Sequence, residues 1–192
     1  MKVRNLFILI IVAMTLMACG GGDYSPKPQA YLRINTPEAS YIRIDTLPFS
    51  FEKNTATTLI IKKDTRHELW VDLSYPQWDG VVFLTYKRLR SSEDLRGQID
   101  TSSRLLEKHY QFASGIDEQV FESDDHTVHA VKWHLKGKNV ASTYQFYATD
   151  SLHHFLRGAL FINRPPNNDS LAPVLEYMQR DIDHLIETLC WR

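Results

Sequence analysis

The chain opens with a hydrophobic pattern that the rest of it does not repeat. An apolar run extends from Leu6 to Met17, interrupted by Thr15, and the basic residues Lys2 and Arg4 precede it. As a helix this run would reach about 18 Å, whereas a bilayer core is about 30 Å thick and needs about 20 residues. The run is therefore too short for an ordinary membrane span, and it predicts a signal peptide over residues 1–18.

Residues 30–87 carry the signals of β-strands. Residues 69–75 place an apolar side chain at every second position, which is the period of a strand, and residues 81–87 form a second strand-like run. Pro76, Asp79 and Gly80 between them supply turn chemistry, so we predict a hairpin. Shorter β-branched or aromatic runs, separated by prolines and turns, lie at 30–34, 41–44, 49–51 and 57–61.

The pattern then changes to a helix over residues 91–113, with apolar positions spaced three or four apart. Ser91 can cap this helix, with Asp94 at the reciprocal position, and Gly115 would end it. A short strand at 119–122 follows. Three longer strands, at 127–136, 140–149 and 153–163, then predict a meander.

A second helix is predicted after Pro165 and Pro166, from the capping residues 167–170 to about Leu189. It carries an unusually complete apolar stripe. The stripe favours packing across a sheet, and docking onto a partner protein is the alternative. The order of strands, helix, meander and helix predicts an α+β fold in which two helices cover an antiparallel sheet. This order also resembles PsbP-type domains, a likeness of fold that says little about function.

The first apolar run ends in Leu16-Met17-Ala18-Cys19. This junction looks like a bacterial lipobox, in which the cysteine thiol receives a diacylglyceryl group and becomes the first mature residue. A cysteine is needed because the thiolate is the nucleophile, and two acyl chains hold a protein stably at a membrane. We predict lipidation of Cys19; the alternatives are a plain secretory peptide with a chance cysteine and an uncleaved signal anchor.

Composition limits the mature chain. Of 192 residues, 174 remain after the leader, enough for one domain with its own core. The chain has 22 Lys and Arg and 23 Asp and Glu; loss of Lys2 and Arg4 leaves 20 against 23, a charge of −3. Nucleic-acid binding, which needs a basic excess, is therefore not expected. Glycines and prolines in residues 19–29 predict a lipidated N-terminus with a flexible tether, and 30–192 a single globular domain.

One cysteine remains beyond the lipidation site. If Cys19 is lipidated, no intrachain disulfide is available to Cys190. Because Cys190 follows an apolar helix, we expect it to be buried and structural rather than catalytic. No second apolar run is long enough to span a membrane.

The histidines do not form a metal motif. His126 and His134 share one strand parity, His129 has the other, and the adjacent His153 and His154 point to opposite faces. Solvated or hydrogen-bonded histidines are therefore expected, with a metal centre built from distant segments as the alternative, and we predict no metal, no cofactor and no catalytic residues. Nucleophile-elbow, phosphate-loop and zinc-protease motifs are absent from the sequence.

A few other residues are candidates. Asp181 and His184, three apart on the last helix, could orient a catalytic imidazole, but a helix-surface pair is the expectation. Trp78, in the turn at 76–80, is a possible partner contact; the alternative is that it folds back on its own sheet. If the domain bound a small ligand or acted as an enzyme, His129, Trp133 and Asp181 would be the residues to test first.

Several stretches together resemble one family. They are 24–28, 31–34, 75–76, 84–87, 145–151, 154–160, 168–173 and 184–187. The chain resembles the gliding motility lipoprotein GldD family of Bacteroidota across nearly all of its mature length. The resemblance implies a cell-envelope lipoprotein needed for gliding motility and type IX secretion, with no established enzymatic activity, and it carries over only Cys19 as a functional residue.

Two hypotheses follow. The first is a non-enzymatic accessory lipoprotein that binds other gliding or secretion proteins of the envelope and the membrane through its lipid. The second is a membrane-anchored periplasmic domain that binds a small ligand or acts as an enzyme. Gly20, in place of aspartate, favours the outer membrane, and the single acid in residues 20–23 favours a periplasmic orientation.

Overall fold

The alternating segments form two antiparallel sheets in the computed structural model, which describes residues 34–192. The strands are β1 (Tyr41–Ile44), β2 (Phe49–Asn54), β3 (Thr58–Asp64), β4 (Glu68–Tyr75), β5 (Gly80–Arg88), β6 (Gly115–Glu122), β7 (His129–Lys136), β8 (Tyr144–Thr149), β9 (His154–Ile162) and β10 (Cys190–Trp191). The larger sheet has the order β3-β4-β5-β9-β8-β7-β6 and the smaller one β1-β2-β10.

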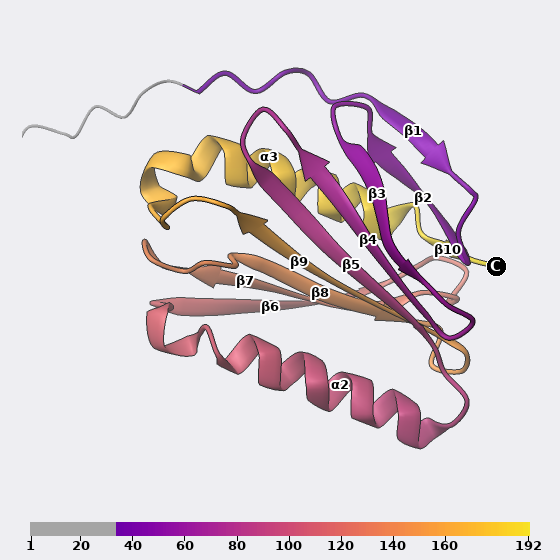
Figure 1. The fold of residues 1–192 in the computed structure, drawn as a ribbon. Coiled ribbons are helices and arrows are strands. Elements are labelled where there is room, and N and C mark those ends of the chain that lie inside the picture. The colour runs from indigo at the N-terminus through magenta and orange to yellow at the C-terminus, as the bar shows by residue number, and fades with distance from the viewer. Residues whose placement is uncertain (1–33) are drawn as a thin grey trace, which may run out of the picture. The chain divides into compact units, whose positions relative to one another are not determined.

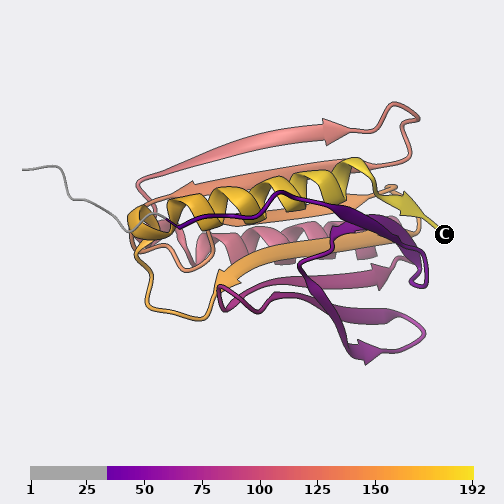
Figure 2. The same cartoon turned by 90° about the horizontal axis from the view of Figure 1, so that it is seen from above.

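Two helices, α2 (Ser92–Glu107) and α3 (Asn168–Glu187), pack on the sheets, and a 3-10 turn, η1 (Tyr110–Phe112), follows α2. Figure 1 shows α3 on one face of the larger sheet and α2 on the other. Figure 2, from above, shows α3 lying along that sheet beside β1 and β2. The predicted α+β class, an antiparallel sheet with two helices, is confirmed.

The main core lies between the larger sheet, α3 and β2. It includes aromatic residues that are fully buried, such as Phe49, Phe51 and Phe146. A smaller cluster on the opposite face joins Leu106 of α2 to Trp133 and Leu135 of β7. Each face of the sheet therefore has its own helix and its own apolar contacts.

The predicted hairpin is formed by β4 and β5, which pair from Glu68 opposite Lys87 to Tyr75 opposite Gly80. The predicted alternation along β7 is also present: Trp133 and Leu135 face α2, whereas Ala130 belongs to the core beneath α3. The period-two pattern was a sufficient signal for these strands because the two faces of each strand have different surroundings.

Helix α2 begins as predicted, since the Ser91 side chain accepts a hydrogen bond from the Asp94 N–H at 3.2 Å. It ends at Glu107, six residues before the predicted end at 113. Leu106 is the last of its side chains to be buried against the sheet, and Tyr110 is exposed. The chain turns there because the Ser114 N–H must reach the Lys136 carbonyl for β6 to start.

Helix α3 packs its apolar stripe on the sheet, which is the favoured of the two alternatives in the sequence. A polar contact adds to this packing on the side of β7 and β8. Asp183 accepts hydrogen bonds from Lys132 Nζ at 2.7 Å and from the Tyr144 hydroxyl at 2.6 Å. The helix is thus fixed by apolar contacts along its stripe and by charged ones at the stripe's edge.

The expectation that Cys190 is buried is wrong: its side chain is exposed. Cys190 and Trp191 form the two-residue strand β10, which pairs with Ser50 and Phe49 of β2. Because neighbouring side chains in a strand point to opposite faces, the packing of Trp191 against Phe49 and His154 directs Cys190 outward.

Candidate functional site

The most extensive buried polar cluster centres on Asp181, which lies on the inner side of α3 and is 6% exposed. Its carboxylate accepts hydrogen bonds from the hydroxyls of Tyr41 and Tyr75, both at 2.9 Å. The side-chain amide of Asn54 donates to both carboxylate oxygens at 3.1 and 3.0 Å, and to the Tyr177 hydroxyl at 2.7 Å. We call these five residues the Asp181 cluster.

In the Asp181 cluster, the hydroxyls of Tyr41 and Tyr75 donate hydrogen bonds and the carboxylate accepts them. Burial, together with hydrogen bonding to the Asp181 carboxylate and its charge, raises the pKa values of Tyr41 and Tyr75 well above the usual value for a phenol. Both phenols therefore stay protonated and act as donors. Since both carboxylate oxygens of Asp181 are occupied, the carboxylate is placed to link β1, β2, β4 and α3 rather than to take a proton from a substrate.

A pocket of about 420 Å³ adjoins this cluster at the surface. The segment 36–39 forms one wall, and Tyr41, Tyr177 and Arg180 form much of the rest, with Asp181 at its edge. The polar atoms of the tyrosines and Asp181 are directed at one another. The pocket is therefore a surface hollow next to a satisfied network.

The expectation of a surface pair between Asp181 and His184 is wrong. Asp181 points inward, whereas His184 stacks on Tyr41 at a ring-centroid distance of 3.8 Å. The His184 Nε2 lies 2.8 Å from a carboxylate oxygen of Glu52, a residue of β2. The two side chains have separate partners because Asp181 falls on the apolar stripe and His184 at its margin.

Trp78 folds back toward the sheet. Its ring lies 5.0 Å from that of Tyr177 and 6.2 Å from that of Tyr75, and it is half-buried against the main core. This placement favours a packing role, although the residue is only partly buried. A contact between Trp78 and a partner stays a prediction.

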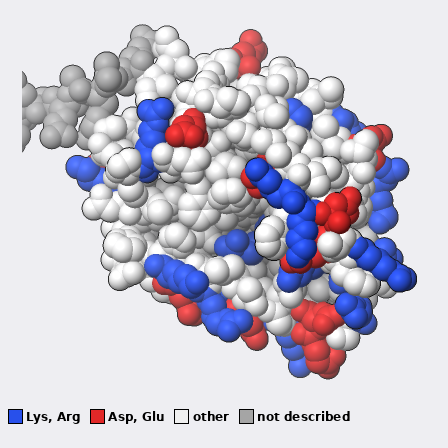
Figure 3. All heavy atoms as spheres, in the orientation of Figure 1, with Lys and Arg blue, Asp and Glu red and all other residues white. Residues whose placement is uncertain are grey.

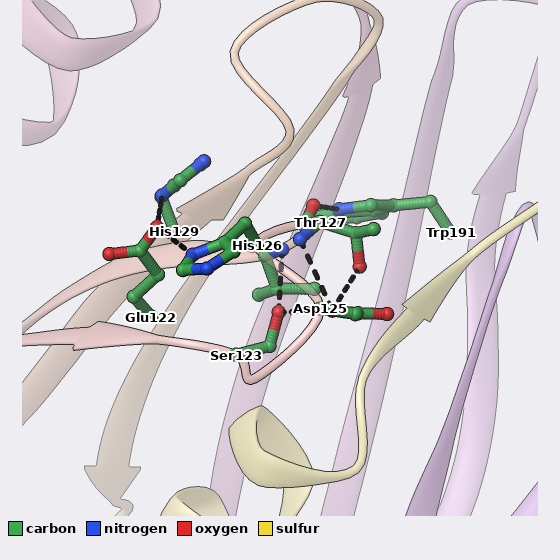
Figure 4. A network of polar contacts seen from close by, with 8 residues as sticks. Glu122, Ser123, Asp125, His126, Thr127, His129 and Trp191 are labelled. Atoms are coloured by element: carbon green, nitrogen blue, oxygen red, sulfur yellow. Dashed lines mark hydrogen bonds and ion pairs between the residues drawn. The ribbon is translucent and has the colours of Figure 1, made fainter.

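The histidines of the β6–β7 region have ordinary hydrogen-bonding partners. Glu122 lies 2.6 Å from His126 Nδ1 and 3.6 Å from His129 Nδ1, as Figure 4 shows. The Asp125 carboxylate next to them accepts hydrogen bonds from Ser123 and Thr127. Within residues 34–192, the structure shows no group of three or more His, Cys, Asp or Glu side chains that could hold a metal ion.

The sequence predicts that the adjacent His153 and His154 point to opposite faces; in the structure His153 lies just before β9, and the two ring centroids are 6.3 Å apart. His153 is exposed near Asp150, whereas the buried His154 is hydrogen-bonded through Nδ1 to the Tyr86 hydroxyl at 2.8 Å. Burial lowers the pKa of His154 below that of an ordinary histidine. His154 is therefore a satisfied core histidine.

The three residues nominated for a ligand-binding or enzymatic site do not converge. His129 and Trp133 lie on the side of β7 that faces α2, where the Trp133 Nε1 donates to Glu118 at 2.7 Å. Asp181 lies across the sheet, beneath α3. A single site cannot use all three.

The sequence reasoning missed the partners of Asp181. One signal was present, because Asp181 comes four residues after Tyr177 and four before Leu185, both of which are buried. That spacing puts the carboxylate on the buried side of the helix. The partners gave no local signal, since Asn54 and Tyr75 are 127 and 106 residues away in the sequence.

Cys19, the predicted lipidation site, lies outside the described residues. Among the residues that are described, none of the helices is long and apolar enough to cross a membrane.

A comparison with curated proteins gives no significant match. A family model does match: that of the gliding motility lipoprotein GldD, over residues 21–191. The match spans both sheets, both helices and the whole Asp181 cluster. The chain therefore belongs to the gliding motility lipoprotein GldD family.

Proposed function

We propose that the protein is a non-enzymatic accessory lipoprotein of the cell envelope that serves gliding motility and type IX protein secretion. The observation that carries the proposal is the family match over residues 21–191. The lipobox-like junction before Cys19 agrees with it independently.

The interior of the domain supports the non-enzymatic part of this proposal. Phe49, Phe51 and Met178 fill the space between α3 and the larger sheet, and each is essentially inaccessible to solvent. The most buried carboxylate, that of Asp181, has both oxygens occupied by neighbouring side chains. Such a body is suited to binding other proteins with its surface.

The lipid on Cys19 would place this surface at the outer membrane, facing the periplasm. Attachment confines a protein to a thin layer and so raises its effective concentration for neighbours in that layer. The partners would be other envelope proteins of gliding and type IX secretion, and the role of the domain would be to hold or stabilise them there.

A deletion with complementation tests the proposal. Deletion should block export of type IX cargo and surface spreading; wild type and Cys190→Ser should restore both, and Cys19→Ser should not. Radiolabelled palmitate should enter the wild-type protein and the Cys190→Ser variant but fail to enter Cys19→Ser. Unchanged cargo export in a clean deletion would contradict the proposed function. Incorporation of palmitate into Cys19→Ser would contradict lipidation at Cys19.

Photo-crosslinking in living cells tests the partner surface. A photoreactive phenylalanine at Trp78 should crosslink to envelope proteins, whereas the same residue at the exposed Leu152 serves as the control. Equal crosslinking from both positions would count against a contact at Trp78.

A further inference from the structure

Three arginines converge at one corner of the larger sheet. Arg66 and His67 lie in the β3–β4 turn, and Arg88 and Arg90 flank Leu89 where β5 leads into α2. These five residues line a pocket of about 300 Å³, which we call the arginine pocket. In Figure 3, blue side chains with acidic ones between them gather on the right, where Figure 1 places this corner.

The two segments are held by backbone contacts, so the pocket has a fixed frame. The Arg88 N–H donates to the His67 carbonyl at 3.0 Å, and the Leu89 N–H donates to the His153 carbonyl at 2.8 Å. The Leu89 side chain is buried, whereas Arg88 and Arg90 on either side are exposed. The backbone thus presents two guanidinium groups beside the turn that carries the third.

These arginines have no acidic partner among residues 34–192: Arg66, Arg88 and Arg90 take part in no ion pair there, and their guanidinium groups form no hydrogen bond to another described side chain. The nearby acids are occupied otherwise. Glu68 is paired with Lys63 and, at 3.4 Å, with Lys87. Asp94 accepts the Arg90 backbone N–H at 3.0 Å.

Glu68 and Asp94 line the adjoining hollow, and two further acids belong to neighbouring segments. Asp150 accepts the backbone N–H groups of residues 152, 153 and 154. Asp64, at the end of β3, is not one of the residues that line the pocket. The lining itself therefore carries three positive charges, before any charge on His67 is counted, and contains no negative one.

We propose that the arginine pocket binds a phosphate group. Like charges held close together repel one another, and a bound anion relieves that repulsion. Guanidinium groups form paired hydrogen bonds with phosphate oxygens, and a tetrahedral dianion offers enough oxygens for three of them. The volume is at the lower end of the range for small-ligand sites, about 300–1,000 Å³, so it suits a headgroup-sized ligand.

The phosphate could come from a lipid headgroup or from a soluble phosphate compound, since both present the same chemistry. Isothermal titration calorimetry of the purified full-length protein in detergent distinguishes them. The probes are inorganic phosphate, glycerol 3-phosphate and a water-soluble short-chain phosphatidate, with short-chain phosphatidylcholine as the zwitterionic comparison.

The variant Arg66→Gln/Arg88→Gln/Arg90→Gln removes the pocket charges. The matched control, Arg104→Gln/Lys138→Gln/Arg164→Gln, removes the same charge from exposed residues elsewhere. Because all six side chains are exposed, both variants should keep the wild-type melting temperature. We expect the pocket variant to weaken phosphate binding by about tenfold or more, or about 1.4 kcal/mol, and the control to change it by less than about twofold.

Binding of inorganic phosphate and glycerol 3-phosphate as tight as that of the phosphatidate supports a soluble ligand. Markedly tighter binding of the phosphatidate, lost in the pocket variant, supports a lipid headgroup. No measurable binding of any phosphate probe to the wild type would overturn the proposal. So would equal weakening by the two triple variants, because binding would then depend on overall charge alone.

Discussion

Whether a buried polar side chain in this domain stabilises the fold depends on its hydrogen-bonding partners. Asp181 is almost inaccessible to water, and a buried carboxylate without donors would cost several kcal/mol. Three side chains from three strands satisfy it, namely Tyr41, Asn54 and Tyr75. The carboxylate thereby links the smaller sheet to the larger one through α3, and its removal would leave buried donors without acceptors.

We expect Asp181→Ala to lower the free energy of unfolding by about 2–4 kcal/mol, because the Asn54 amide and the Tyr75 hydroxyl lose the carboxylate that accepts their hydrogen bonds. Glu176→Ala, an exposed position on the same helix, should change it by less than about 0.5 kcal/mol. Urea titration followed by circular dichroism measures both. Equal losses in the two variants would contradict a structural role for Asp181.

Because the Cys190 side chain is exposed, the number of free thiols can show whether Cys19 is lipidated. Of the two cysteines in the chain, only Cys190 should react with a thiol reagent in the folded, lipidated protein, and Cys190→Ser should show no reactive thiol. Thiol titration of membrane-extracted protein, before and after denaturation, gives the count. Two thiols in denatured wild type would mean that Cys19 is unmodified, and none before denaturation would mean that Cys190 is buried.

At the scale of helices and strands, the sequence pattern predicted those features that depend on interactions between residues close together in the chain. The β4–β5 hairpin, the faces of β7 and the Ser91 cap follow from alternation and side-chain chemistry within a few residues. The end of α2 does not, because distant contacts with the sheet fix it. Strand β8 likewise begins at Tyr144, four residues later than predicted, since Asn168 of α3 occupies the Val140 carbonyl at 2.9 Å.

Strand β9 depends on a glycine for its contact with β8. A Cβ at Gly158 would overlap the ring of Phe146, its paired residue on β8, which is buried in the main core. We expect Gly158→Ala to destabilise the protein by about 1–3 kcal/mol.

Gly97 provides the control for that substitution, because a Cβ there would have no neighbour within 4 Å. In a helix, alanine is favoured over glycine by about 1 kcal/mol, so Gly97→Ala should raise stability. Thermal and urea unfolding of both variants give the comparison. A neutral Gly158→Ala would show that the Phe146 ring can move aside at no cost.

The buried tyrosines around α3 make the free energy of unfolding of the protein depend on pH. Burial and the Asp181 carboxylate raise the pKa of Tyr75, so the unfolded chain loses this proton at about pH 10 while the folded chain keeps it. The stabilisation is complete below pH 10 and is lost as the pH rises beyond it, by about 1.4 kcal/mol per pH unit. Tyr75→Phe should therefore flatten the alkaline fall in the free energy of unfolding.

The exposed Tyr110→Phe serves as the control in this measurement and should leave the alkaline slope unchanged. Urea unfolding at a series of pH values from 8 upward gives the slopes for all three proteins. If the slope of Tyr75→Phe equals that of the wild type, ionisation of Tyr75 does not contribute.

For the described domain as a whole, the last residues of the chain join parts that are distant in sequence. Trp191 stacks on His154 of β9 at 5.2 Å and lies edge-on to Phe49 of β2 at 6.5 Å. Its Nε1 donates to the Thr127 carbonyl in the β6–β7 turn at 2.9 Å, as Figure 4 shows. One side chain thus connects the smaller sheet, the larger sheet and the turn that carries His126.

This placement predicts that loss of Trp191 lowers the stability of the whole domain and does not only loosen the last residues of the chain. Trp191→Ala should lower the free energy of unfolding by about 2–4 kcal/mol, because it removes a packed aromatic ring. Trp191→Phe keeps part of the ring and loses the hydrogen bond to Thr127, so it should cost about 1 kcal/mol. Trp70→Ala, at a residue that is 44% exposed, should cost less than Trp191→Ala.

Hydrogen exchange measured by mass spectrometry locates the effect of Trp191→Ala. If Trp191 joins the two sheets, exchange should rise in β2, β9 and the β6–β7 turn together. A rise limited to residues 188–192 would mean that β10 is only an appended strand. The first result would also place the C-terminus among the elements that hold α3 in position, since the chain runs from α3 through Thr188 and Leu189 directly into β10.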